Sequence, residues 1–305
     1  MASQSFHSIL VALDGTASDH KVLSYLGFLN KSLKFERIYF LHVVQSLSLP
    51  DPIQKEYADL LAPMDENLEE LFKETVGEYF DLGKTSCDFL IREGHVYEEI
   101  LHHSHIKNVD LIVMGRKSTK DRHKHLSSRL TEQGPCSILL VPETTLPEVH
   151  EIIIPTDFSK QSAKTIQMAD RLAEQFLADL RCIHYYSYAR GYLKSGISTV
   201  ELRSAVSAYS HTQWEDLKSK NGLSPDIHCE FSENEGNMEE QCLSRAHHIG
   251  ADLMILSSKG RNSSASILLG SFARELTEIN RIIPMLILKE KNENLGFFEA
   301  IKALL

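Results

Sequence analysis

The stretch Asp252-Leu-Met-Ile-Leu-Ser-Ser-Lys-Gly260 is followed, after nine residues, by Gly270-Ser271. The apolar run in its middle has the length and composition of a central parallel strand. We expect Gly260 to let the backbone turn through conformations that a side chain would forbid. Gly270-Ser271 opens the helical pattern 272–279, whose first amides have no partner inside the helix and lie at its positive dipole end. This stretch predicts a site for a nucleotide phosphate in the C-terminal half of the chain.

The composition is that of an ordinary soluble globular protein. The 305 residues suggest two domains, since a typical domain has roughly 100–200 residues. Hydrophobic residues make up 42% of the chain, charged residues make up 24%, and the formal net charge is −10. This acidic balance disfavours nucleic-acid binding, which needs a basic surface. No apolar run approaches the roughly 20 residues that span a bilayer, so no membrane association is expected.

Two further features favour a cytoplasmic location. The N-terminal residues 1–7 lack the basic region and apolar stretch of a secretory signal. The cysteines are scattered, odd in number and without a CxxC pair, which fits reduced thiols better than a disulfide or zinc framework.

The chain is an internal repeat of one strand–helix pattern. Matched residues, such as Asp14 with Asp157 and Asp110 with Asp252, lie 142 or 143 positions apart. The expected strands are 8–13, 37–44, 87–91, 110–114 and 137–141 in the first half, and 151–155, 179–184, 227–231, 253–256 and 283–288 in the second. Strands that alternate with helices predict parallel sheets with helices on both faces. In such sheets a ligand binds at the carboxyl ends of the strands, where the winding reverses.

This pattern divides the chain into two domains and a tail. The first domain is expected over 1–143 and the second over 149–290, with a short linker near Pro142–Pro147. The tail 291–305 is amphipathic enough to form a docking helix.

Three motifs carry a resemblance to a known family. The first strand of each half ends in Val-Ala-Leu-Asp14 or Ile-Pro-Thr-Asp157, and the second ends in Leu41-His42-Val43 or Ile183-His184-Tyr185. The loop after the fourth strand of the second half reads Ser257-x2-Gly260-x9-Gly270-Ser271, against a family pattern G-x2-G-x9-G-S/T. On these residues the chain resembles the universal stress protein family in its tandem two-domain form.

The resemblance implies two tandem Rossmann-like (adenine nucleotide alpha hydrolase-like) domains, each a five-stranded parallel sheet of order 3-2-1-4-5 with helices on both faces. It implies ATP or ADP as the cofactor, with Mg²⁺ as a further candidate, and it assigns no catalytic residue and no protein metal site. Tyr185 stands where the family usually has a valine, and Ser257 replaces a glycine. By position, the cofactor-binding residues are Pro155, Thr156, Asp157, Tyr185, Ser257, Gly260, Arg261, Gly270, Ser271 and Phe272.

The first half departs from the family loop. Its spacing reads Gly115-x2-Ser118-x9-Ser128-Arg129, and an alternative alignment puts Lys124-His125 where Gly270-Ser271 should be. Two glycines are missing either way, so the nest of backbone amides is not expected to form there. We therefore expect one nucleotide site, in the second half, and a degenerate first half.

Structural interpretations remain open beside the functional ones. Asp157 alternatively fixes the turn into its helix, and Gly260 and Gly270 alternatively serve tight turns only. His42 and His184 end buried strands and are expected to be hydrogen-bonded core residues. The basic run 116–124 is expected to be a solvated loop, with an anion or an acidic partner as the alternative.

The expected function is that of a cytosolic stress-response protein that binds adenine nucleotide, acts on a protein partner and does not catalyse rapidly. One alternative is a slow ATPase or phosphotransferase, although the chain has no Walker lysine-serine pattern. The other is a nucleotide-free interaction scaffold. The family also pairs domains through their fifth strands, so 138–141 and 283–288 are expected to form an intrachain pseudo-dimer, with a homodimer as a further alternative.

Overall fold

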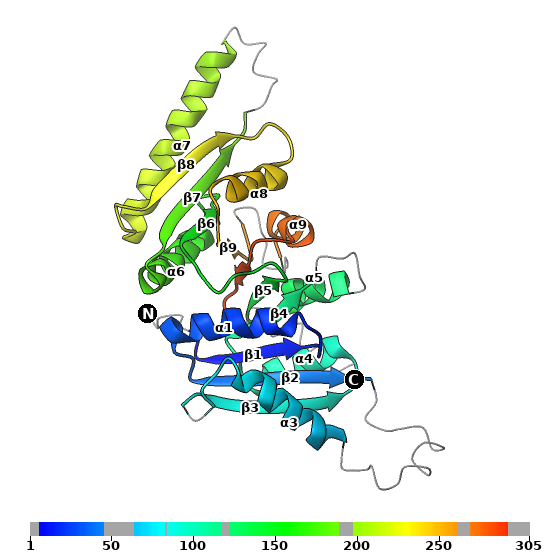
Figure 1. Ribbon diagram of the computed structural model, residues 1–305. Helices are drawn as coiled ribbons and strands as arrows, with labels where there is room; N and C mark the ends of the chain where they lie inside the picture. Colours follow the sequence, from blue (N-terminus) through cyan, green and yellow to red (C-terminus); the bar gives the residue numbers. More distant parts are fainter. Residues whose placement is uncertain are drawn as a thin grey trace. The chain divides into compact units, whose positions relative to one another are not determined.

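The computed structural model describes residues 6–45, 64–82, 84–117, 123–188, 198–260 and 269–291 (Figure 1). Contacts divide the chain into two compact units. The first unit comprises the chain up to Glu148 together with residues from Lys289 onward, and the second comprises Val149–Leu288. Predictions for Arg261 and for most of the tail 291–305 lie outside the described residues.

The first unit is built on a parallel sheet. Its strands are β1 (Ser8–Leu13), β2 (Arg37–Val44), β3 (Ser86–Glu93), β4 (Leu111–Arg116) and β5 (Ser137–Pro142). They pair side by side in the order β3-β2-β1-β4-β5, and every pairing is parallel. The inner strands are apolar along most of their length because both faces of such a sheet are covered.

Four helices of the first unit pack on this sheet. They are α1 (Asp19–Leu33), α3 (Met64–Gly77), α4 (Val96–Ile106) and α5 (His123–Gln133). The helices α1 and α3 cover one face, and α4 and α5 cover the other (Figure 1).

The second unit repeats this architecture. Its strands are β6 (Glu151–Pro155), β7 (Asp179–Tyr186), β8 (His228–Glu233), β9 (Leu253–Ser257) and β10 (Met285–Leu288), and they pair in parallel in the order β8-β7-β6-β9-β10. Its helices are α6 (Lys160–Phe176), α7 (Thr199–Asn221), α8 (Met238–His248) and α9 (Ser271–Ile279). In both units the strand order is 3-2-1-4-5, so the predicted fold is confirmed.

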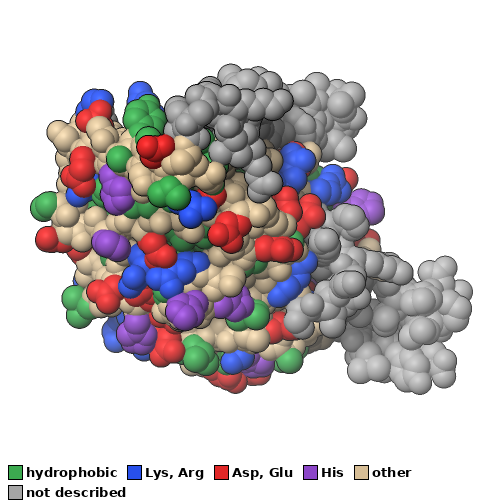
Figure 2. All heavy atoms as spheres, turned by 90° about the horizontal axis from the view of Figure 1, so that it is seen from above, with side chains coloured by type: hydrophobic (Ala, Val, Ile, Leu, Met, Phe, Trp, Pro, Cys, Tyr) green, Lys and Arg blue, Asp and Glu red, His purple; other side chains and the backbone are tan. Residues whose placement is uncertain are grey.

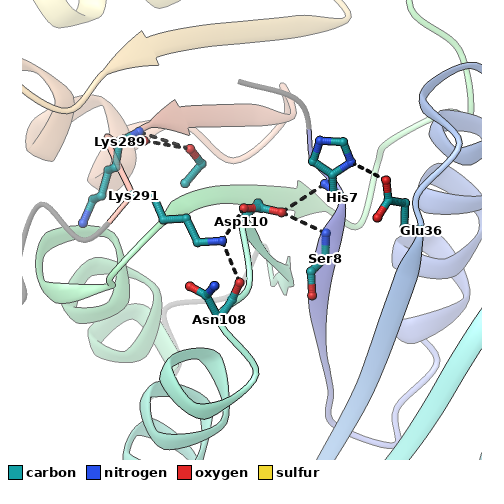
Figure 3. Close-up of polar contacts among 8 residues, drawn as sticks. His7, Ser8, Glu36, Asn108, Asp110, Lys289 and Lys291 are labelled. Atoms are coloured by element: carbon teal, nitrogen blue, oxygen red, sulfur yellow. Dashed lines mark hydrogen bonds and ion pairs between the residues drawn. The ribbon is translucent and has the colours of Figure 1, made fainter. Parts of the chain in front are cut away.

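An aspartate before the fourth strand ties that strand to the first strand in each unit. The carboxylate of Asp252 accepts hydrogen bonds from the backbone amides of His150 at 2.8 Å and Glu151 at 3.1 Å. Asp110 accepts the equivalent bonds from His7 at 3.0 Å and Ser8 at 2.9 Å (Figure 3). The strand β4 therefore begins one residue later than predicted, because Asp110 serves this junction, whereas β9 begins at Leu253 as predicted.

The residues after β10 are anchored in the first unit by two lysines. Lys291 Nζ lies 2.7 Å from Asp110 Oδ1 and donates to the carbonyl of Asn108 at 2.8 Å (Figure 3). The buried Lys289 donates from Nζ to the carbonyls of Glu132 and Gly134, each at 3.1 Å. These carbonyls lie at the C-terminal end of α5, where backbone oxygens lack helical partners and favour a cation.

The surface carries charges of both signs, and the cysteines are unpaired, as the composition leads one to expect. Acidic and basic side chains are interspersed over the face seen in Figure 2. All five cysteines are free thiols. Within the described ranges, none of the helices combines the length and apolarity needed to cross a bilayer.

Because Asp252 joins the starts of β6 and β9, its replacement should lower the free energy of unfolding measurably. Replacing it with alanine leaves two backbone amides without their acceptor, which typically costs about 1–3 kcal/mol. Urea unfolding followed by the fluorescence of Trp214, the single tryptophan, reports on the second unit. The control is Asp216→Ala, which removes an exposed pair with Lys220 and should cost below about 0.5 kcal/mol. Equal losses in the two variants would contradict this role of Asp252.

Candidate functional site

A cavity in the second unit lies at the carboxyl ends of β6, β7 and β9 and beside the start of α9. Its volume is about 1000 Å³. Nine of the ten predicted site residues line it, and the tenth, Arg261, lies outside the described residues. The nine are Pro155, Thr156, Asp157, Tyr185, Ser257, Gly260, Gly270, Ser271 and Phe272.

The carboxylate of Asp157 is held at the turn between β6 and α6. Its Oδ1 accepts hydrogen bonds from Ser159 N at 3.0 Å and from Ser162 Oγ at 2.9 Å. Ser159 also caps α6 by accepting from Ser162 N. Asp157 therefore does fix the turn into its helix, as the structural interpretation expected. Its second oxygen, Oδ2, faces the backbone of Gly260.

The reason predicted for the glycine at position 260 is wrong. The described glycines with positive φ are Gly15, Gly94, Gly222, Gly236 and Gly250, and Gly260 is not among them. Other residues could therefore adopt the backbone conformation of Gly260. The space beside its Cα, however, is too small for a side chain without a shift of the neighbouring group. A Cβ added at Gly260 would lie 3.0 Å from Asp157 Oδ2, which is closer than nearly all real contacts of this kind. The absence of a Cβ at Gly260 allows the carboxylate of Asp157 to approach the backbone closely.

The second glycine brings the two ends of the loop together. Gly270 N donates to Ser258 O at 2.8 Å, and the buried Ser258 donates from its own amide to Leu288 O at 3.0 Å. A Cβ added at Gly270 would lie 3.8 Å from Gly260 N, so the two glycines are neighbours although ten positions separate them. Gly270 has φ −64° and ψ 149°, which any residue can adopt.

The N-terminus of α9 opens on the cavity. Its N-cap is Gly270, which has no side chain to accept a hydrogen bond from the first turn, and the first turn contains no acidic residue. At the start of α8, by contrast, Asn237 accepts from the amides of Glu239 and Glu240. The start of α9 therefore offers backbone amides and a positive dipole end to an anion.

An aromatic cluster packs around His184, which lines the cavity. The carbonyl of Thr156 accepts a hydrogen bond from His184 Nδ1 at 2.8 Å. The ring of Phe158 stacks on His184 with the centroids 4.0 Å apart, and it also packs near Trp214 and Phe231. The predicted hydrogen-bonded role of His184 is confirmed, and His42 makes the matching bond to the carbonyl of Leu13 in the first unit.

Tyr185 lies at the end of β7 and faces the cavity as a neutral phenol. Burial is the main cause that raises the pKa of this phenol well above its ordinary value of 10.0. The first residue of α8, Met238, lines the same side. This wall is therefore largely apolar, with one hydroxyl.

Sequence reasoning missed several residues of the site. Phe158 has φ 59° and stands where the first half has Gly15, with φ 75°, so alignment of the two halves marks it as a non-glycine in a glycine turn. Lys259 and Arg274 line the cavity and were not predicted to do so. The sequence could also have identified Lys259, because it aligns with Lys117 when the two halves are compared.

The matching position in the first unit holds an ion pair. Lys117 Nζ lies 2.8 Å from Asp14 Oδ2, while Asp14 Oδ1 accepts from the amide and hydroxyl of Thr16. Burial raises the pKa of Asp14, but the hydrogen bonds from Lys117 and Thr16 outweigh it, and the pKa lies below 3.8. The hydrogen bond to Asp14 raises the pKa of Lys117 above 10.5.

Comparisons with known proteins give the family and the fold. The model of the universal stress protein family matches residues 5–142 and again 148–279. The crystal structure of a universal stress protein from Archaeoglobus fulgidus superposes with a TM-score of 0.63 and 20% identity, over 95% of this chain and 100% of that chain. A functionally unknown protein from Pseudomonas aeruginosa gives 0.67 and 15%, over 98% of both chains. No curated protein matches the chain significantly.

Because Lys117 pairs with Asp14 in the first unit, removal of the lysine should shift the titration of the Asp14 carboxyl group. Lys117→Met should raise the pKa of Asp14, measured by NMR titration of its carboxyl carbon. Because the folded pKa lies below 3.8, the pair stabilises the fold above that pH, and this contribution is lost as the pH falls through the folded pKa. Both side chains are partly exposed, so the loss at neutral pH should stay below about 1 kcal/mol.

Lys84→Met is the control for this titration, because Lys84 forms an exposed pair with Asp81 elsewhere in the same unit. It should leave the Asp14 titration unchanged. An Asp14 pKa that does not move in Lys117→Met would show that the ion pair does not hold the carboxylate.

Proposed function

Since the chain belongs to the universal stress protein family, we propose that its second unit binds ATP or ADP and that the protein acts as a nucleotide-dependent regulator in the stress response. The proposal assigns the phosphates to the start of α9 and the loop that begins at Ser257. It assigns the adenine to the wall made by β7 and α8.

One observation carries this proposal. Gly260, Gly270 and the carboxylate of Asp157 meet at the N-terminus of α9, inside one cavity of about 1000 Å³. Backbone amides without a helical partner, at the positive end of a helix dipole, suit a phosphate. The cavity lies at the carboxyl ends of parallel strands, the usual place for a ligand in this class of sheet.

The opposite wall suits a purine. Ile183, Tyr185 and Met238 offer apolar and aromatic surface, and the phenol of Tyr185 adds a hydrogen-bonding group. Ligand pockets combine a mostly apolar lining with a few polar groups in this way. Backbone groups at the end of β7 would contact the adenine, as the resemblance to the family implies for this position.

Regulation fits this site better than fast catalysis. One oxygen of Asp157 is engaged by Ser159 and Ser162 in a structural turn. Its other oxygen is a hard ligand of the kind that Mg²⁺ accepts, so a nucleotide-bound Mg²⁺ would lie beside Asp157. Binding would alter the surface around the start of α9 and thereby the contact with a protein partner. We place this activity in the cytoplasm, and the pairing of the fifth strands stays a prediction.

Nucleotide binding should raise the melting temperature of the full chain. A ligand at one hundred times its Kd stabilises the folded state by about 2.7 kcal/mol, which corresponds to several degrees. Gly270→Glu should abolish the shift, because a carboxylate would then occupy the phosphate position. Gly270→Ala should keep part of it, since the added Cβ makes only ordinary contacts, at 3.6 Å from Ser258 O and 3.8 Å from Gly260 N.

The control adds the same charge outside the site. Ala205→Glu lies on the exposed part of α7 and should leave the ligand-induced shift at the wild-type value. Differential scanning fluorimetry with ADP and with ATP measures all four proteins. The absence of any shift in the wild type with either nucleotide would refute the proposal.

A further inference from the structure

We infer that a second cavity of the second unit, at the opposite end of its sheet, docks a basic segment of a protein partner. This cavity has a volume of about 460 Å³ and lies at the amino ends of β6, β7 and β8, beside the end of α6. The two ends of β7, which has eight residues, are about 20–25 Å apart. The inference therefore goes beyond the proposed nucleotide site and can be tested separately from it.

The most buried residues that line this cavity are apolar. Ala173 and Ile227 are buried, while Ala178 and Leu180 are partly exposed. Leu177, in the turn between α6 and β7, also lines the cavity and is 93% exposed. Apolar surface of this kind covers the alkyl stem of a lysine or arginine while the charged head stays in a polar environment.

Five carboxylates line the same cavity, and most of them are unbalanced. Glu151 pairs with Arg181, whose Nε lies 2.9 Å from its carboxylate. No other lysine or arginine lines the cavity. The remaining carboxylates form no ion pair with any residue that the structure describes, and they belong to Asp170, Glu174, Asp179 and Asp226. Four negative charges therefore remain for a ligand to neutralise.

Two of these carboxylates lie where the unit by itself disfavours them. Asp170 and Glu174 are four positions apart in the last two turns of α6, near the negative end of the helix dipole, and the last turn holds no basic residue. Burial and then the charge of Glu174 raise the pKa of the Asp170 carboxyl group, against the opposite effect of Arg171. A bound cation would relieve the repulsion between the two carboxylates.

The first unit shows that this end of the fold does not require acidic residues. The residues after α1 and after α6 both have a left-handed conformation, and the starts of β2 and β7 pair with the first residues of β1 and β6, which aligns the two units. On this alignment Lys31, Lys34 and Arg37 occupy the positions of Glu174, Leu177 and Asp179. The negative charge is therefore particular to the second unit.

A peptide segment with adjacent basic and apolar residues fits this surface best. Its basic side chains complement the unbalanced carboxylates, and an apolar neighbour covers Leu177. A small polyamine would neutralise the carboxylates but leave Leu177 exposed. A second copy of the chain would have to dock through its own basic positions near Lys31, against the net charge of −10 that every copy carries.

The probe is the peptide Gly-Leu-Arg-Lys-Leu-Gly, acetylated and amidated at its ends, and its Kd for the full chain is measured by isothermal titration calorimetry. Glu174→Gln combined with Asp179→Asn should raise this Kd about tenfold, or about threefold for each carboxylate. Raising the salt concentration from about 50 to about 500 mM should weaken binding to the wild type, because the charges are then screened. A peptide with glutamine in place of its arginine and lysine should not bind measurably.

The control removes the same charge elsewhere. Glu70→Gln combined with Glu74→Gln changes two exposed residues of α3 and should leave the Kd within about twofold of the wild-type value. Leu177→Ser should raise the Kd of the peptide about threefold and leave that of spermine unchanged, since only the peptide covers this side chain. Urea unfolding followed by Trp214 fluorescence verifies that the second unit of each variant is folded. The melting shift caused by ADP should be the same in all variants, whatever the outcome with the peptide.

Four results would overturn the inference. They are the absence of peptide binding to the wild type, an equal loss of affinity in the control pair, and binding of spermine as tightly as the peptide. The fourth is a rise in the mass of the wild-type chain with concentration, measured by light scattering and lost in the variant of Glu174 and Asp179, because the cavity would then dock a second copy.

Discussion

The candidate site depends on the close approach of one carboxylate to a backbone without a side chain. Asp157 Oδ2 lies where a Cβ on Gly260 would be only 3.0 Å away, and the other oxygen of Asp157 is fixed by the start of α6. This contact lies between residues that follow the first and fourth strands of the second unit. The hydrogen bond from Gly270 N to Ser258 O then brings the start of α9 to the same point. The backbone amides at the start of α9 can bind an anion together with the rest of the site only when they lie at this point.

The two units make different polar contacts on the same scaffold. Both have the same strand order and the same aspartate junction before the fourth strand. They differ at the carboxyl ends of the strands, where Lys117 lies on Asp14 in the first unit and the glycine pair lies beside Asp157 in the second. A short stretch at the tips of the strands can therefore change what a unit binds, because the core below it is unaffected.

Comparison of the two halves of the sequence predicted the repeated strands, the aspartate pair and the location of the loop, because apolar runs and constant offsets can be read directly from the chain. The strand order was implied by the resemblance to the family. It did not predict why Gly260 is a glycine, because close approach depends on a residue about a hundred positions away. Nor did it find Phe158, whose left-handed conformation costs about 1–2 kcal/mol. That cost is offset by stacking on His184, a contact that exists only in the folded unit.

The sequence by itself determined the family, the repeat and the candidate loop, since these follow from residue types at set spacings. Only the tertiary structure decided which polar groups face each other. It placed Lys117 on Asp14, oriented one oxygen of Asp157 toward Gly260, and brought Lys259 and Arg274 to one cavity. The physical reason is that charge pairing and close packing act through space, over a few ångströms, between segments that the chain keeps far apart.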